Sequence, residues 1–338
     1  MIRPDLESLP AYVPGARNER AIKLSSNECA EEPLPSVQEA MSRALATMNR
    51  YPDMGAVELR AALARHLGVD EAQVAVGTGS SALCQQLVTA AAGPGDEVVF
   101  PWRSFEAYPI FAQIAGAMPV AVPLTADHRV DLPALAAAVT QDTKLVFVCN
   151  PNNPTGTTVT DAEFAAFMAS VPEDVLVALD EAYFEYNRAA DTPVATDVIT
   201  RYPNVVGLRT FSKAYGLAGA RVGYAFGPRA IIEALNKVAV PFSVSSVAQV
   251  AALASLDAQD ELHARVDATV AERSRIVEKL GLSESQANFV WLPREGQDLA
   301  DRLAAEGVLV RVFPEGIRVT VTNAEETDAL LEAWDRAQ

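Results

Sequence analysis

Short apolar runs rich in β-branched residues alternate with alanine-rich stretches along most of this chain. The stretches between the runs predict helices such as Ser81–Ala92, Asp161–Ser170 and Ala230–Val238, the second opened by a capping-box pattern at Thr160 and Glu163. The runs predict strands at Gln73–Val76, Glu97–Phe100, Met118–Val122, Leu145–Cys149, Val175–Leu179, Val205–Leu208 and Val222–Phe226. Apolar strands that alternate with helices indicate a mostly parallel sheet covered on both faces. We therefore predict a large α/β domain over residues 30–245.

The pattern changes after residue 245. Helical stretches are predicted at Val247–Leu256, Glu261–Leu280, near Asp298–Glu306 and from Glu325 onward, and strands at Asn288–Leu292, Val308–Val312 and Gly316–Val321. This pattern predicts a small α+β domain over residues 246–338. Residues 1–29 form a proline-rich arm with a strand of its own at Ile22–Ser25, which we expect to join the small domain or a partner subunit.

Composition narrows the class of protein. The chain has 338 residues, enough for two domains, and its net charge of −17 disfavours nucleic acid and anionic membranes as partners. An anionic substrate would need local arginines or lysines that overrule this charge. No apolar run reaches the roughly 18 residues of a spanning helix, and residues 1–10 lack a signal-peptide pattern. The three cysteines are scattered and the three histidines isolated, so we expect reduced thiols, a cytoplasmic location and no metal site.

Ligands of open parallel sheets bind beyond the carboxyl ends of the strands. After the first predicted strand comes Gly77-Thr78-Gly79-Ser80-Ser81, which opens a helix. Glycines let an anion approach the backbone closely, and the free N–H groups of a helix start bind phosphate. A plain connection explains the same segment equally well. The spacing is neither GxGxxG nor GxxxxGK[ST], which argues against a dinucleotide or P-loop nucleotide site.

Three more segments follow predicted strands. They are NPNNPTG from Asn150 to Gly156, DEAY from Asp180 to Tyr183, and SKAYGLAGARVGY, which contains Lys213 and Arg221. Taken singly, they have simpler interpretations as a turn, a buried ion pair and a solvated lysine. Taken together, a lysine that can form a Schiff base, an acid that can hold a pyridinium N–H and a phosphate cradle suit pyridoxal 5′-phosphate (PLP).

In this order and spacing, these segments resemble the fold-type I PLP-dependent aminotransferases, and within them the histidinol-phosphate and aromatic aminotransferase group. The resemblance extends from Tyr12 to Arg318. It implies a three-layer α/β fold, with PLP bound covalently to Lys213. Lys213, Asp180 and Tyr183 are the implied catalytic residues: Lys213 moves the proton, Asp180 pairs with the pyridine nitrogen, and Tyr183 binds the 3′-oxygen.

The resemblance also implies the other binding residues. Trp102 competes with Phe105 for the place of the ring over the cofactor. Ser81 and Ala82 stand where family members often have an acidic pair. Tyr51 resembles the tyrosine that reaches the phosphate from the other subunit, which implies a homodimer with shared active sites. The implied cofactor-binding residues are Gly79, Ser80, Ser81, Phe105, Asn153, Asp180, Tyr183, Thr210, Ser212, Lys213, Arg221 and Tyr51. The implied substrate-binding residues are Tyr12, Asn27, Asn153, Arg311 and Arg318.

Several functions are compatible with these motifs. The leading hypothesis is a ping-pong aminotransferase that exchanges nitrogen between glutamate and aromatic 2-oxo acids, phenylpyruvate and 4-hydroxyphenylpyruvate. The segments 81–87 and 101–106 favour it, because they resemble the actinobacterial aromatic enzymes. A histidinol-phosphate aminotransferase is the alternative. A PLP-dependent lyase or decarboxylase is compatible with the same fold, and a non-catalytic regulatory module is disfavoured by the intact Lys213.

Overall fold

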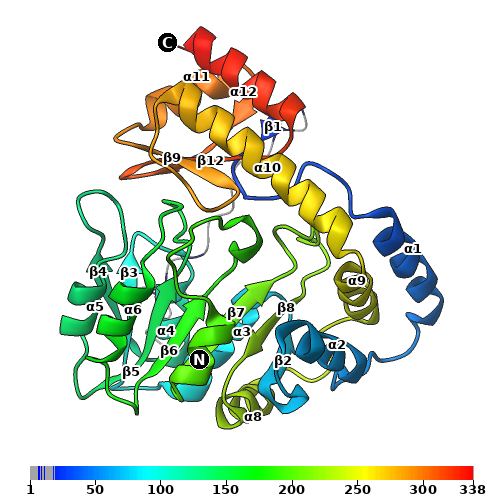
Figure 1. Cartoon of the computed structure of the whole chain (residues 1–338), viewed down its shortest axis with the longest axis vertical. Coiled ribbons are helices and arrows are strands. Elements are labelled where there is room, and N and C mark those ends of the chain that lie inside the picture. The colour runs from blue at the N-terminus through cyan, green and yellow to red at the C-terminus, as the bar shows by residue number, and fades with distance from the viewer. Residues whose placement is uncertain (1–6, 8, 10, 12–17, 19, 338) are drawn as a thin grey trace.

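The computed structural model describes residues 7, 9, 11, 18 and 20–337. The largest sheet in the described part of the chain has seven strands, in the order β2-β8-β7-β6-β5-β3-β4 (Figure 1). The central pairs are parallel, and β8 runs antiparallel to β7 and to β2. Its strands are β2 (Val74–Gly77), β3 (Glu97–Trp102), β4 (Met118–Pro123), β5 (Thr143–Cys149), β6 (Leu176–Asp180), β7 (Val205–Thr210) and β8 (Gly223–Phe226).

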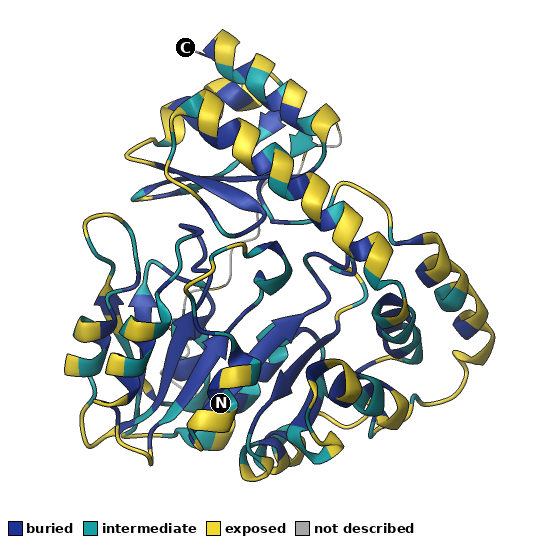
Figure 2. Ribbon diagram, viewed as in Figure 1, coloured by how far each residue is buried: buried dark blue, intermediate teal, exposed yellow. Residues whose placement is uncertain are grey.

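Helices cover both faces of this sheet, and the alternation along β5 shows why. Val146 and Val148 belong to one apolar core, whereas Leu145, Phe147 and Cys149 belong to a second core on the other face. Figure 2 shows the strands buried and the helices striped with exposed positions. The first core includes residues of α2 (Val57–Leu67), α5 (Leu132–Ala137), α6 (Asp161–Met168), α7 (Ala195–Arg201) and α9 (Ser246–Asp257). The second core includes residues of α3 (Ser80–Ala91), α4 (Tyr108–Ala115) and α8 (Arg229–Val238). The predicted three-layer α/β fold is confirmed.

A smaller unit packs beside the large sheet. Its antiparallel sheet has the order β11-β12-β9, and its core includes Val290, Ile317 and Leu330. The strands are β9 (Phe289–Pro293), β10 (Val308–Leu309), β11 (Arg311–Phe313) and β12 (Gly316–Thr320). The helices are α10 (Gln259–Leu280), α11 (Gln297–Ala305) and α12 (Ala324–Ala337). The predicted strand Val308–Val312 is divided in two, since β10 and β11 belong to different sheets.

The N-terminal arm joins the smaller unit. Strand β1 (Ile22–Lys23) pairs in parallel with β10, and it is shorter than the predicted strand Ile22–Ser25. Helix α1 (Pro35–Ala44) packs on α9, and α9 shares a core with α2. The domain boundaries at residues 29 and 245 stay predictions. No helix of the described residues is long and apolar enough to cross a membrane.

Candidate active site

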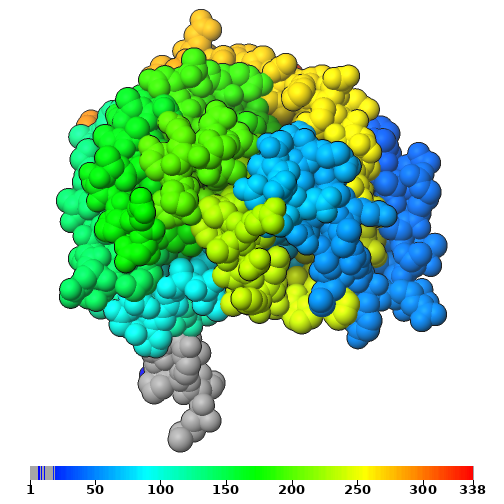
Figure 3. Space-filling model, turned by 60° about the horizontal axis from the view of Figure 1, so that its bottom comes forward, coloured from blue at the N-terminus to red at the C-terminus, as the bar shows by residue number. Residues whose placement is uncertain are grey.

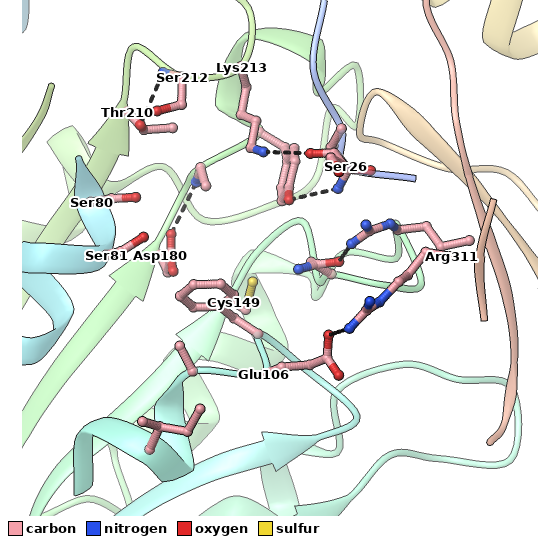
Figure 4. Close-up of a pocket in the computed structure, with 18 of the residues that line it drawn as sticks. Ser26, Ser80, Ser81, Glu106, Cys149, Asp180, Thr210, Ser212, Lys213 and Arg311 are labelled. Atoms are coloured by element: carbon pink, nitrogen blue, oxygen red, sulfur yellow. Dashed lines mark hydrogen bonds and ion pairs between the residues drawn. The ribbon is translucent and has the colours of Figure 1, made fainter. Parts of the chain in front are cut away.

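A pocket of about 450 Å³ lies beyond the carboxyl ends of β5, β6 and β7. Its walls come from the large sheet, from the start of α3, from the arm at Ser25–Asn27 and from Arg311 and Arg318 of the small sheet. Figure 4 shows Lys213 and Asp180 facing this space, with Ser80 and Ser81 on one side and Glu106 and Arg311 on the other. The pocket therefore joins segments that are far apart in the sequence.

Asp180 is a buried carboxylate at the floor of the pocket. It is the last residue of β6, and the register places it opposite Cys149 of β5 and Leu208 of β7. The Tyr108 hydroxyl donates to Oδ2 at 2.6 Å, and the Ala182 N–H donates to Oδ1 at 3.2 Å. Burial raises the pKa of Asp180 to about 6, and the Tyr108 hydrogen bond opposes that rise. A ligand cation at this carboxylate would be stabilised.

Lys213 lies in the turn that follows β7. Its Nζ donates to the Ser26 carbonyl at 3.3 Å, and the Cys29 thiol donates to the Lys213 carbonyl at 3.0 Å. Burial, together with the nearby Arg318 guanidinium, lowers the pKa of Lys213 to about 8. A larger fraction of this amine is therefore neutral at physiological pH than of an exposed lysine, which suits a nucleophile or a base.

The start of α3 forms an anion cradle with Arg221. Gly79, the N-cap of α3, has φ +81°, and a Cβ there would lie 2.6 Å from Arg221 Nη2. Arg221 Nη1 donates to Ser212 Oγ at 3.3 Å, and the Ser212 N–H donates to Thr210 Oγ1 at 3.1 Å. Hydroxyls, a guanidinium and a helix N-terminus thus converge where a side chain at position 79 would intrude. This donor set suits a phosphate group.

The wall towards the small sheet carries a hydrogen-bonded chain. Asn27 Nδ2 donates to the Tyr183 hydroxyl at 3.0 Å, and burial raises the pKa of Tyr183. Arg318 Nη1 donates to Asn153 Oδ1 at 2.5 Å, and its Nη2 donates to the Ser25 carbonyl at 2.6 Å. The guanidinium is therefore held in one orientation between the large sheet and the arm, with its planar fork suited to a carboxylate.

Comparison with known proteins assigns the family. Residues 19–333 match the model of the family described as aminotransferase class I and II. An aromatic amino acid aminotransferase of Corynebacterium glutamicum (strain R) is 65% identical over 336 residues, 99% of this chain and 98% of that protein. One of Mycobacterium bovis (strain BCG / Pasteur 1173P2) is 56% identical over 98% of this chain and 96% of that protein. This chain belongs to the class I and II aminotransferases.

A solved structure supports the same family for this aminotransferase. The histidinol-phosphate aminotransferase of Sinorhizobium meliloti, in complex with PLP, aligns with a TM-score of 0.90 at 32% identity, over 99% of this chain and 97% of that one. The site fits such a cofactor on its own chemistry: Lys213 suits the aldehyde, Asp180 suits a protonated ring nitrogen, and the cradle at Gly79 suits the phosphate.

The aminotransferase brings most of the predicted site residues to one pocket. Gly79 adjoins it, and the others that line it are Asn27, Ser80, Ser81, Phe105, Asn153, Asp180, Tyr183, Thr210, Ser212, Lys213, Arg221, Arg311 and Arg318. Of the two candidate rings, Phe105 lines the pocket. The Trp102 ring instead lies under Arg103, with the guanidinium carbon 4.3 Å from the ring centre.

Of the predicted residues that the structure describes, Tyr51 lies away from this pocket. Tyr51 is 83% exposed and contacts the ring of Phe242 at 4.7 Å between centroids. Tyr12 lies outside the described residues. Sequence reasoning missed Tyr108 and the role of Glu106. Tyr108 is the first residue of α4, and its ring contacts that of Phe105 with 5.4 Å between centroids.

Proposed function

We propose that this aminotransferase exchanges an amino group between glutamate and aromatic 2-oxo acids such as phenylpyruvate and 4-hydroxyphenylpyruvate, with PLP as cofactor. The observation that carries the proposal is the apolar wall of the pocket, formed by Phe105, Ala107, Ile110 and Phe111. An aromatic side chain gains free energy by leaving water for such a wall. The relatives named as aromatic amino acid aminotransferases, 56–65% identical, support the same substrate class.

Three groups of pocket residues would bind different parts of PLP. Ser80, Ser81, Thr210, Ser212 and Arg221 would hold the phosphate of PLP at the cradle. Asp180 would keep the ring nitrogen protonated, and Asn153 and Tyr183 would hydrogen-bond the 3′-oxygen. The bound ring supplies an electron sink for the carbanion that forms at the substrate Cα.

Lys213 and Arg318 would act on the substrate. Lys213 would hold PLP covalently, and its amine, when free, would carry the proton that leaves or returns to the substrate Cα. Arg318 would bind the α-carboxylate with both arms of its fork, which Asn153 and the Ser25 carbonyl hold in place. This clamp orients the substrate so that its side chain extends along the apolar wall. Asn27, through its contact with Tyr183, would close the site from the arm.

We further propose a homodimer in which Tyr51 reaches the partner's phosphate site. Tyr51 is 83% exposed, and Figure 3 shows the blue segment of α1 and α2 at the surface beside the yellow-green segment of α8. Large apolar side chains are also exposed within six positions of Tyr51 in the sequence, or within two of its ring contact Phe242: Leu45, Met48, Met54, Val57, Val240 and Phe242 itself. A group of such side chains is typical of a protein–protein interface. The cytoplasmic location stays a prediction.

One assay tests the substrate class. The kcat/KM of the purified enzyme is measured with glutamate as donor and phenylpyruvate, 4-hydroxyphenylpyruvate or imidazole acetol phosphate as acceptor. We expect a preference of about tenfold or more for the aromatic acceptors, equal to roughly 1.4 kcal/mol in the transition state. Lys213→Ala should abolish turnover and the visible absorbance of the bound cofactor. A preference for imidazole acetol phosphate would instead support a histidinol-phosphate aminotransferase, the function of the Sinorhizobium structure.

A further inference from the structure

An acidic residue and an arginine form an ion pair inside the pocket. Glu106 lies in the loop between β3 and α4, and its Oε2 is 2.9 Å from Nη2 of Arg311 on β11. Both residues line the pocket, and Figure 4 shows them reaching towards each other at its edge. Their side chains are 29% and 17% exposed. The pair is thus partly shielded from water, which strengthens the interaction relative to a surface pair.

A second arginine lies directly beside this pair. Arg311 and Arg318 are opposite each other in the β11–β12 register, and both guanidinium carbons lie 5.7 Å from the centre of the Phe313 ring. Two like charges in such a position repel each other. They would also attract a ligand that carries two negative charges. The carboxylate of Glu106 neutralises one of the two charges and leaves Arg318 to the α-carboxylate.

We propose that Glu106 is a specificity-determining residue that removes the charge of Arg311 from substrate binding. With this pair intact, the pocket favours acceptors with one carboxylate and an uncharged side chain. A ligand with a second anionic group, the donor glutamate included, binds at the cost of displacing Glu106 from Arg311. This inference rests on the proposed function, because it concerns the side-chain end of the same substrate pocket. A distal phosphate or carboxylate must displace Glu106 from Arg311 or lie close to its negative charge, and both cost free energy.

A matched control exists in the same part of the fold. Arg103, three residues before Glu106, forms an ion pair with Glu315 in the turn between β11 and β12, with Nε 3.1 Å from Oε2. That pair joins the same two segments, and neither Arg103 nor Glu315 lines the pocket. Glu315→Gln therefore removes an equivalent structural contact without changing the charge of the pocket. In Glu106→Gln, the Arg103–Glu315 pair remains intact and continues to hold the β11–β12 turn against the loop.

The experiment compares wild type, Glu106→Gln, Glu106→Asp and Glu315→Gln, each loaded with PLP. For every enzyme, kcat/KM is measured with imidazole acetol phosphate and with phenylpyruvate. We expect Glu106→Gln to raise the ratio of the first value to the second by about tenfold, mainly through a lower KM for the phosphorylated acceptor. Glu106→Asp should restore most of the wild-type ratio, and Glu315→Gln should leave it unchanged.

Binding of non-reacting ligands gives a second readout that does not depend on turnover. The dissociation constants of glutarate and 3-phenylpropionate are measured by calorimetry with the same four enzymes. Glu106→Gln should bind glutarate several-fold more tightly and 3-phenylpropionate with little change. An unchanged ratio and unchanged glutarate affinity in folded, PLP-loaded Glu106→Gln would overturn the inference. Failure of the proposed function appears separately, as wild type that does not use phenylpyruvate.

Discussion

Asp180 receives its hydrogen bonds from a phenol and a backbone amide at the end of a buried strand. The sequence alone predicted that this acid would meet a cation, and the chain provides Tyr108 instead. Its carboxylate therefore has an unfavourable environment until a cationic ligand binds. The raised pKa, about 6, reflects this burial.

A substitution at Asp180 should separate stability from activity. Because folding raises this pKa from 3.8 to about 6, the folded protein binds more protons than the unfolded chain between those values, and stability falls as pH rises through the window. The free energy of unfolding of cofactor-free Asp180→Asn, measured by urea denaturation, should therefore exceed that of wild type. The expected difference is about 3 kcal/mol at pH 8 and roughly half of that at pH 5. The same variant should lose most transaminase turnover. If wild type and Asp180→Asn had the same free energy of unfolding at both pH values, the prediction would be contradicted.

At the scale of the element, the junction of β2 and α3 forms the proposed phosphate site. The strand ends at Gly77, Gly79 turns the chain at φ +81°, and α3 begins at Ser80 with its N–H groups directed at the pocket. Antiparallel β8 supports this turn from behind, since a Cβ on Gly223 would lie 2.5 Å from the Ser80 nitrogen. A bulky residue at either glycine would move the helix start.

Gly79→Ala should weaken PLP binding selectively. The added methyl would meet Arg221 Nη2 at 2.6 Å, and the backbone conformation disfavours alanine. We expect the dissociation constant for PLP, measured by absorbance titration, to rise by about tenfold or more. The control is Gly281→Ala, where φ is +63° and nothing lies within 4 Å of the added Cβ. It should lose about 1 kcal/mol of stability and keep its affinity for PLP. Equal affinities in the two variants would argue against a cradle at Gly79.

At the scale of the whole molecule, the pocket differs from the rest of the chain in charge. The net charge of −17 would repel an anionic substrate, yet Lys213, Arg221, Arg311 and Arg318 all line the same pocket. These residues come from β7 and its turn and from the small sheet, so only the packing of the two sheets brings them together. Local charge overrules the global charge, as the sequence argument required of an anionic ligand.

Mixing of two inactive variants tests the shared active site. If Tyr51 serves the partner's cofactor, a heterodimer of Tyr51→Ala and Lys213→Ala contains one site with both residues intact. We expect mixing after reversible dissociation to restore about a quarter of wild-type activity, the statistical share for random pairing of a symmetric dimer. Subunit exchange is followed with two affinity tags. Proven exchange without recovered activity would show that Tyr51 acts within its own chain.

The sequence by itself determined the layers of the fold, the family and most of the residues that line the pocket. Apolar strands alternating with helices leave few solutions besides a covered parallel sheet, and the carboxyl ends of such strands meet at one edge. Asn153, Asp180 and Lys213 could be predicted for that reason: each lies at or beyond the carboxyl end of a buried strand, and the strands β5, β6 and β7 are neighbours.

Only the tertiary structure decided the contacts between segments without a local signal. Tyr108 reaches Asp180 across 72 positions of sequence, Glu106 reaches Arg311 across 205, and Arg318 reaches the Ser25 carbonyl across 293. No periodicity or motif links such pairs. The first forms when α4 packs on the large sheet, and the other two form when the small sheet and the arm pack over it. The same packing chose Phe105 over Trp102 for the pocket and divided the predicted strand Val308–Val312 between two sheets. Local sequence selects the elements, whereas side-chain packing between distant elements decides which of their residues meet.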